Sequence, residues 1–186
     1  IVHGTTVTTN AVLTERGAKT GLLTTSGVRD ALEMRRGIRE EQYNNRYPNV
    51  TPVVPRYLRR PVEERLNYAG EELTPLDEQD VKDACELFIA EGVGAVAKMM
   101  PQAYLSVSTR VIPSIRFYDR VSTTSLNAFV GPILKRYLEA LLAKLAQVKY
   151  QNVLLIMQSN GGVISPQVAM DNAATTLLSG PAGGPV

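Results

Sequence analysis

The stretch NVLLIMQ, residues 152–158, constrains the fold more than any other part of this sequence. Its apolar residues follow one another without polar alternation, which predicts a strand that is buried on both faces. Both faces of such a strand need cover, and helices normally provide it. Near the start of the chain, residues 7–15, 20–25 and 28–34 predict a helix, a strand and a second helix, each helix ending at the next glycine. The sequence therefore predicts an α/β protein.

Residues 74–92 carry the clearest helical pattern. Thr74 or Asp77 can cap the first turn, acidic residues follow the cap, and Gly92 ends the helix. On the apolar face, Cys85 is expected to act as a small core residue rather than as a nucleophile. The full face is predicted to consist of Val81, Ala84, Cys85, Phe88 and Ile89.

A longer helix is predicted from Phe117 onward, with Pro132 kinking it or restarting it after Gly131. After the buried strand, the sequence predicts a glycine turn, a short helix from Pro166 and a strand TTLLS at residues 175–179. The second half of the long helix carries a stripe of residues spaced for packing against other elements: Leu134, Tyr137, Leu138, Leu141, Leu142 and Leu145.

Residues 38–74 differ from the rest of the chain because they are rich in proline, arginine and tyrosine and have no long period. We interpret this segment as a surface loop with a hairpin, containing a short strand around RPVEERLN at residues 60–67. The alternative is an arm that contacts another subunit, since arginine and tyrosine are enriched at the cores of interfaces.

Two further strands are predicted at residues 93–98 and 103–109, and only four residues separate them. Parallel strands need a crossover of a dozen or more residues, so this spacing permits only a tight antiparallel hairpin. The alternative, which we favour, is that residues are missing between Lys98 and Met99. Because the chain starts at Ile1 and not at a methionine, we also expect it to be an internal segment of a larger polypeptide.

Composition argues against several classes of function. Twenty basic residues face eighteen acidic ones, so neither nucleic acid nor a polyanionic surface is expected as a partner. No apolar run approaches the roughly 20 residues of a membrane span, so no membrane partner is expected. With one histidine and one cysteine in the chain, we expect no self-contained metal site and a reducing, cytoplasmic location.

Three short loops carry the residues best suited to bind a ligand: HGTT at 3–6, SNGG at 159–162 and SGPAGG at 179–184. Glycine lets a ligand approach the backbone closely, and a loop between a strand and a helix presents its N–H groups to an anion. The last two loops follow predicted strands, where α/β proteins commonly bind ligands. The alternatives are plain turns and, for Thr5 or Thr6, a helix cap.

The ionisable residues support weaker hypotheses. His3, the only histidine, could act as a general acid or base, but a structural role is the more common one. Asp30, Glu33 and Asp119 are the acids nearest to the predicted loops and helix starts. Their spacing pairs no two carboxylates, so no catalytic dyad is predicted and the catalytic residues stay unknown.

Taken in order, three segments resemble the hydantoinase A / 5-oxoprolinase family. They are HGTTVTTN through EMRR at residues 3–36, YDRVSTTSLNAFVGPILKRYL at 118–138, and MQSNGGVISPQVAM with LLSGPAGGPV at 157–186. Within the family, residues 37–66 look most like the hydantoinase-like (beta) subunit of acetone carboxylase, and acetophenone carboxylase is a related possibility.

The resemblance implies an ATP-dependent enzyme with an actin/hexokinase-like (ribonuclease H-like) fold, in which helices flank a mixed sheet and of which this chain is a fragment. It implies an N-terminal region at residues 1–112 and the start of a core domain at 113–186. Family members phosphorylate an amide or carbonyl oxygen. The residues that match the family's loops, and would line the nucleotide or substrate cleft, are Gly4, Thr5, Thr6, Asn160, Gly161, Gly162, Ser179, Gly180, Gly183 and Gly184.

For an acetone carboxylase, the resemblance implies that acetone, bicarbonate and ATP give acetoacetate, AMP and two phosphates. It implies ATP and Mg²⁺ as cofactors, Mn²⁺ in a partner subunit, and alpha- and gamma-type subunits as partners. Two alternatives stay open. The first is a hydantoinase or 5-oxoprolinase that cleaves a cyclic amide, and the second is a non-catalytic assembly module.

The chain departs from the family pattern in two ways. The aspartate- and glycine-rich loops D-x-G-G-T, which hold magnesium and the ATP phosphates in the family, are absent before GTT and after SGPAGG. This fragment alone is therefore not expected to turn over ATP. The family also carries a helix's worth of residues between the strands predicted at 93–98 and 103–109, in agreement with a missing segment there.

Overall fold

The computed structural model describes residues 1–38, 40–95 and 103–182. For residues 181 and 182 it describes the backbone alone. Contacts divide the chain into two compact units: unit 1 is Ile1–Ala18 with Leu126–Val186, and unit 2 is Lys19–Ser125. The two units are defined by contacts between residues, so unit 1 combines both ends of the chain. The division into regions 1–112 and 113–186 stays a prediction. The proposed missing segment between Lys98 and Met99 lies outside the described residues.

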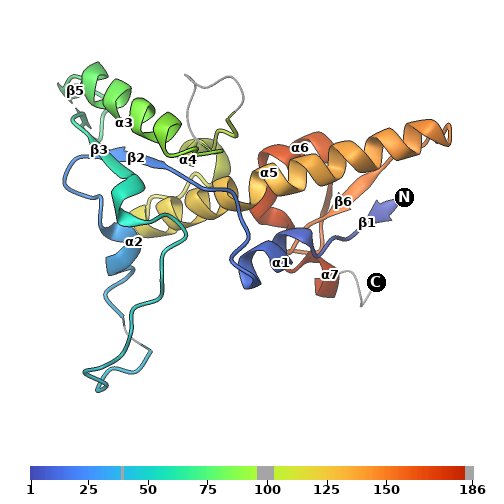
Figure 1. Cartoon of the computed structure of the whole chain (residues 1–186), viewed down its shortest axis with the longest axis horizontal. Helices are drawn as coiled ribbons and strands as arrows, with labels where there is room; N and C mark the ends of the chain where they lie inside the picture. The colour runs from blue at the N-terminus through green and yellow to red at the C-terminus, as the bar shows by residue number, and fades with distance from the viewer. Residues whose placement is uncertain (39, 96–102, 183–186) are drawn as a thin grey trace. The chain divides into compact units, whose positions relative to one another are not determined.

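Unit 1 is built on a three-stranded mixed sheet in the order β1-β6-β7, comprising β1 (Val2–His3), β6 (Leu155–Met157) and β7 (Val163–Ile164). Strands β1 and β6 are parallel, and β6 and β7 are antiparallel. The predicted buried strand is therefore present, although shorter than the apolar run: Ile156 is fully buried and Met157 nearly so. The predicted α/β class is confirmed, with a small mixed sheet and flanking helices (Figure 1).

The long helix α5 (Phe117–Gln147) begins in unit 2 and continues into unit 1. It runs unbroken through Pro132, so the predicted restart is wrong. A proline removes one backbone hydrogen bond, but buried residues on both sides, among them Val130 and Leu134, hold the two halves in one helix. In the described parts of the chain, none of the helices combines the length and the apolar character needed to span a bilayer.

The other helices of unit 1 are short: α1 (Val7–Leu13), α6 (Pro166–Asp171), the 3₁₀ turn η2 (Ala173–Thr176) and α7 (Ser179–Ala182). Helix α1 ends before the predicted Gly17, where Glu15 adopts a φ of 53°. Helix α6 begins as predicted at Pro166, and it is capped by the side chain of the preceding serine.

The strand predicted from TTLLS is wrong, because η2 occupies its first half. The Thr175 hydroxyl donates to the Asn172 carbonyl at 2.7 Å, and the Thr176 hydroxyl donates to the Ala173 carbonyl at 2.8 Å. Threonine side chains that bond carbonyls three residues back stabilise a tight turn and outweigh the β propensity of this residue type.

Unit 2 contains the parallel pair β2 (Leu22–Thr25) and β3 (Arg59–Val62), with Leu22 opposite Arg59. Helix α3 (Glu78–Ala90) packs against β3, and Asp77 caps it by accepting the N–H groups of Gln79 and Asp80. The smaller elements are α2 (Ala31–Met34), η1 (Arg56–Leu58) and α4 (Ser108–Val111). The buried core of this unit consists of Leu32, Val54, Leu58, Ala84, Phe88, Val93 and Val121.

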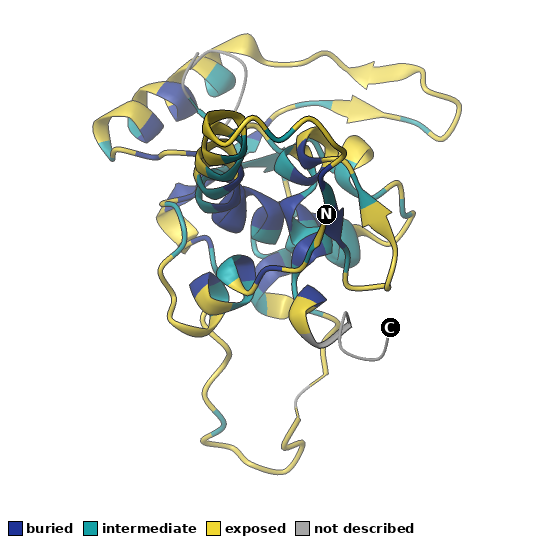
Figure 2. Cartoon of the chain, turned by 90° about the vertical axis from the view of Figure 1, so that its right-hand side faces the viewer, coloured by how far each residue is buried: buried dark blue, intermediate teal, exposed yellow. Residues whose placement is uncertain are grey.

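The hairpin predicted within residues 38–74 is confirmed, since β4 (Arg65–Leu66) pairs antiparallel with β5 (Glu72–Thr74). Both strands are exposed, as is much of the preceding loop (yellow in Figure 2). Tyr43 and Tyr68 are also exposed. The alternative, an arm that contacts another subunit, stays a prediction.

Three sequence expectations for unit 2 need correction. Residues 104–107 form no strand, and α4 takes up most of the second half of the strand predicted at 103–109, because the Val107 carbonyl accepts hydrogen bonds from the N–H groups of Arg110 and Val111. Helix α2 ends at Met34, because the following Arg35, with a φ of 53°, breaks the helical path two residues before the predicted glycine. Ile89, assigned to the apolar face of α3, is 59% exposed.

Candidate functional site

The first predicted loop, Gly4–Thr6, connects β1 to α1. Thr5 is buried, and its Oγ1 accepts a hydrogen bond from the N–H of Val7 at 3.2 Å. Thr6 occupies the N-cap position, makes no side-chain cap bond and is exposed. Thr5 thus lies one residue before the N-cap and satisfies the first N–H of α1, and neither threonine makes a side-chain cap bond of the predicted kind. Gly4 and Thr6 present backbone and a hydroxyl group to the surface.

The third predicted loop packs directly against the first. The Ser179 hydroxyl donates to the Thr5 carbonyl at 3.1 Å, and the Leu178 N–H donates to Thr9 Oγ1 at 2.9 Å. A Cβ atom added to Gly180 would lie 3.2 Å from Cγ2 of Thr6. These contacts join Gly4–Thr6 and Ser179–Gly180 into one feature of unit 1.

The segment SGPAGG does not have the predicted local structure. It was expected to follow a strand as a loop, but it follows η2 and begins with the short helix α7. The reason is the threonine-stabilised turn described above, which replaces the strand. Gly183 and Gly184 lie outside the described residues.

The second predicted loop, SNGG, closes the β6–β7 hairpin, and so the plain-turn alternative describes its backbone. Most of its N–H groups already have acceptors: Ser159 donates to the Thr175 carbonyl, Gly161 to the Gln158 carbonyl and Gly162 to Asn160 Oδ1. Gly161 has a φ of 83°, a conformation that explains the glycine. The expected strand-to-helix seat for an anion is not formed here. What this turn offers to a ligand is the exposed side chains of Ser159 and Asn160.

All three segments nevertheless meet at one edge of the sheet. Since β1 and β6 are parallel, the residues that follow them leave the sheet at the same end. A Cβ atom on Gly4 would lie 4.0 Å from Cβ of Met157, the last residue of β6, and 3.6 Å from the Ser179 carbonyl oxygen. Helix α7 and the start of α1 lie beside this edge in Figure 1.

The chemistry of this edge is that of neutral hydrogen-bonding groups. Gly4, Thr6, Asn160 and Gly180 are exposed, and their backbone, hydroxyl and amide groups suit an anion or a polar carbonyl. The buried hydroxyl groups behind them form hydrogen bonds within the protein. Thr8 Oγ1, for example, lies 3.1 Å from Thr176 Oγ1. No group of three or more histidine, cysteine, aspartate or glutamate side chains able to hold a metal ion occurs among the described residues.

His3 and Cys85 both have structural environments. Nε2 of His3 lies 2.7 Å from the hydroxyl of Tyr137, and the two rings stack with centroids 5.8 Å apart. Cys85 is buried in the core of unit 2. The structural alternative given for each residue therefore agrees with its contacts.

Leu178, next to this edge, has an unusual backbone. Four non-glycine residues in the described ranges have positive φ: Glu15, Arg35, Lys149 and Leu178. The first three follow the ends of α1, α2 and α5, where this conformation is a common way to terminate a helix. Leu178, with φ of 58°, precedes α7 and is 61% exposed. Leu178 also follows the 3₁₀ turn η2 by two residues, but deep burial of its side chain does not compensate its strain.

We expect Leu178→Gly to raise the free energy of unfolding by roughly 0.5–1 kcal/mol, because glycine adopts positive φ without the steric cost of a Cβ atom. Leu178→Val should lower it by about 1 kcal/mol, since a β-branched side chain tolerates this conformation less well. Chemical denaturation of the two variants measures both changes. If glycine and valine destabilise the protein alike, the backbone at Leu178 is not strained.

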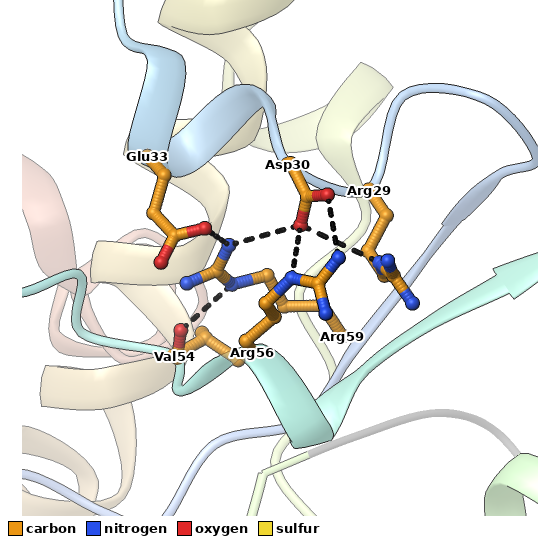
Figure 3. Close-up of polar contacts among 6 residues, drawn as sticks. All are labelled: Arg29, Asp30, Glu33, Val54, Arg56 and Arg59. Carbon is orange, nitrogen blue, oxygen red and sulfur yellow. Dashed lines mark hydrogen bonds and ion pairs between the residues drawn. The ribbon is translucent and has the colours of Figure 1, made fainter.

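Sequence reasoning missed a cluster of charges in unit 2. Arg59 is 1% exposed; its Nε donates to the Val54 carbonyl at 2.9 Å, and its terminal nitrogen contacts Glu33 at 3.2 Å. Asp30 accepts two hydrogen bonds of 3.0 Å from Arg56 (Figure 3). Residue type gave no signal of this cluster, because an arginine normally indicates an exposed position. The third acid considered above, Asp119, pairs with Arg36 at 2.6 Å.

Comparisons with known proteins identify relatives over the whole chain. The hydantoinase/oxoprolinase N-terminal region matches residues 1–109, and the hydantoinase/oxoprolinase family model matches residues 120–186. The alpha subunit of caprolactamase from Pseudomonas jessenii is 35% identical over 207 residues, covering 99% of this chain and 30% of that protein. The gamma subunit of acetophenone carboxylase from Aromatoleum aromaticum is 26% identical, covering 99% of this chain and 30% of that protein.

Solved structures agree. The crystal structure of the ATP-dependent caprolactamase from Pseudomonas jessenii superposes with a TM-score of 0.88 at 35% identity, over 97% of this chain and 30% of that one. The nucleotide-free structure of acetone carboxylase gives a TM-score of 0.84 at 24% identity, over 98% and 30%, which establishes a shared fold. The chain thus spans less than a third of the length of these relatives.

Proposed function

The chain belongs to the hydantoinase/oxoprolinase family, and we propose that it forms part of an ATP-dependent enzyme that phosphorylates the carbonyl oxygen of a small substrate. The oxygen of an amide or of an enolate is a poor leaving group. Phosphorylation of this oxygen allows it to leave as phosphate. The single observation that carries this proposal is the meeting of Gly4–Thr6, residues 159–162 and Ser179–Gly180 at the edge where β1 and β6 end. Ligands commonly bind α/β proteins at such an edge.

In this proposal the residues of the edge divide into two groups. The exposed ones, Gly4, Thr6, Asn160 and Gly180, contact the phosphates or the substrate. Gly161, Gly162, Gly183 and Gly184 belong to this proposal through the family resemblance alone. The buried Thr5 and Ser179 hold the first group in place through the hydrogen bond between them. Since no cationic side chain belongs to this set, bound Mg²⁺ would supply the charge that neutralises the ATP phosphates.

We propose a cyclic amide as the substrate class, because the caprolactamase subunit is more similar to this chain than the carboxylase subunit is, at 35% against 26% identity. Phosphorylation of the amide oxygen would make the carbon open to attack by water and allow the ring to open. A cytoplasmic location and association with partner subunits are part of the proposal, the latter supported by relatives that are themselves named as subunits.

A second candidate is carboxylation of a small ketone, favoured by the 26% identity to the acetophenone carboxylase subunit and by the segment at residues 37–66. As an acetone carboxylase, the enzyme would convert acetone, bicarbonate and ATP into acetoacetate, AMP and two phosphates. It would work with alpha- and gamma-type subunits and Mn²⁺ in a partner. ATP hydrolysis by the complete enzyme distinguishes the two: a lactam alone stimulates it in the first case, and a ketone with bicarbonate in the second.

The test of the site is the pair Thr6→Val and Thr14→Val in the complete polypeptide. Both threonines are exposed, and they lie at the two ends of the same helix α1. A hydrogen bond to a charged group is worth about 1.5–3 kcal/mol, so Thr6→Val should slow substrate-dependent ATP hydrolysis by about tenfold or more. Thr14→Val should change it less than twofold. Equal rates for the two variants would contradict the proposal and favour the non-catalytic assembly module.

A further inference from the structure

Unit 2 contains a cavity of about 600 Å³ that the proposed function does not use. The turn after β2, the helix α2, Pro61 of β3 and the first residues of α5 surround it. Its size falls within the range of about 300–1,000 Å³ found for small-molecule sites. Val28, Met34, Pro61 and Phe117 form much of its apolar wall, and Arg29 and Arg35 supply positive charge.

Two residues of the cavity wall, Arg29 and Asp30, belong to the charged cluster of Figure 3. Three guanidinium groups face the single carboxylate of Asp30: Arg56 through two hydrogen bonds, Arg29 at 3.4 Å and the buried Arg59 at 3.7 Å. Hydrogen bonds from Arg56 lower the pKa of Asp30, which therefore remains ionised. With Glu33 included, three arginines meet two acids, and the cluster keeps one positive charge in excess.

The two arginines of the cavity wall differ in their availability. Arg35 is engaged by Glu40, with its two terminal nitrogens at 2.5 and 3.1 Å from the carboxylate oxygens. Among the described residues, the ion pair of Arg29 is with the carboxylate that it shares with Arg56, and it forms through Nε. The terminal nitrogens of Arg29 are thus the best-placed donors for an incoming anion, and Asp30 holds the side chain in position.

We propose that this cavity binds a small carboxylate with an apolar carbon skeleton. The carboxylate pairs with the Arg29 guanidinium, and the carbon chain lies against Met34, Pro61 and Phe117. Arginine suits this role because its planar group matches the geometry of a carboxylate. The inference stands on the cavity and its charges alone and does not rest on the proposed ATP chemistry.

Titration of the complete protein with hexanoate, followed by calorimetry or by NMR shifts of unit 2 residues, tests the inference. We expect saturable binding, at least tenfold weaker binding of hexanamide, and an affinity at least tenfold lower for Arg29→Met. Arg65→Met is the matched control, since Arg65 is an exposed arginine on β4 that does not line the cavity, and it should leave the affinity unchanged.

A second variant guards against a folding defect in Arg29→Met. Met34 is 71% exposed, so Met34→Glu should fold normally while placing a negative charge in the cavity, and it should also weaken hexanoate binding at least tenfold. Absence of saturable binding, equal affinity for hexanamide, or an equal effect of Arg29→Met and Arg65→Met would overturn the inference. Because no step of this experiment involves ATP, its outcome is separate from that of the Thr6→Val test.

Discussion

Replacing Gly17 by alanine should lower the free energy of unfolding by about 3 kcal/mol, one of the two largest effects expected in this chain. A Cβ atom at this position would overlap three ring atoms of Phe129, a residue that is 9% exposed. The backbone has little freedom to move away, because the N–H of the neighbouring Ala18 donates to the Phe129 carbonyl at 2.8 Å. The ring must therefore leave its place in the core of unit 1, or the segment must detach from α5.

A rescue experiment separates this steric cause from a general intolerance of Gly17 to change. Phe129→Leu removes the ring atoms that the new methyl group would meet, and alone should cost about 1–2 kcal/mol. In denaturant unfolding, the double variant should be more stable than the sum of the two single effects predicts. Additive losses in this cycle would show that the ring is not what excludes a side chain at Gly17.

Asn127→Leu should also cost about 3 kcal/mol. The side chain of Asn127 is fully buried in unit 1, where Nδ2 donates to the Asp171 carbonyl at 3.0 Å and Oδ1 accepts from the Ala174 N–H at 2.9 Å. Leucine has a similar volume but no polar atoms. The substitution leaves the Asp171 carbonyl and the Ala174 N–H, whose hydrogen bonds to Asn127 are partly buried, without these partners. An unsatisfied group that is shielded from water costs about 1–3 kcal/mol.

Asn10→Leu is the control for this prediction, since Asn10 is an exposed residue of α1 in the same unit. Its free energy of unfolding should change by less than about 0.5 kcal/mol. The two asparagines serve as a matched pair in denaturant unfolding. If Asn127→Leu is no more destabilising than Asn10→Leu, the hydrogen bonds of Asn127 do not hold α6 and η2 together.

Much of the fold could be predicted because local chemistry determined it. The apolar run around Ile156 predicted a buried strand, and Asp77 with the acids that follow it predicted the start of α3. Other elements depended on contacts that residue type alone does not reveal. Threonine hydroxyls turned residues 173–176 into a 3₁₀ turn, and packing on both sides of Pro132 kept α5 continuous.

The three segments of the candidate site could be predicted from the sequence, but their arrangement in space could not. Resemblance to a family indicated the three loops, whereas their meeting depends on β1 pairing with β6 across almost the whole chain. One of the hydrogen bonds that engage the SNGG turn, from the Ser159 N–H to the Thr175 carbonyl, also arises from tertiary structure. The buried Arg59 had no counterpart in the sequence prediction, because a charged residue in a strand normally indicates an exposed position.

We propose that Gly4–Thr6 and Ser179–Gly180 together hold the phosphates of a nucleotide. A crystal structure of the complete polypeptide with Mg²⁺ and a non-hydrolysable ATP analogue tests this proposal. We expect phosphate oxygens within hydrogen-bonding distance of Thr6 or of the backbone at Gly4 or Gly180. Phosphates bound elsewhere, with these two segments making no contact to the nucleotide or the substrate, would contradict it.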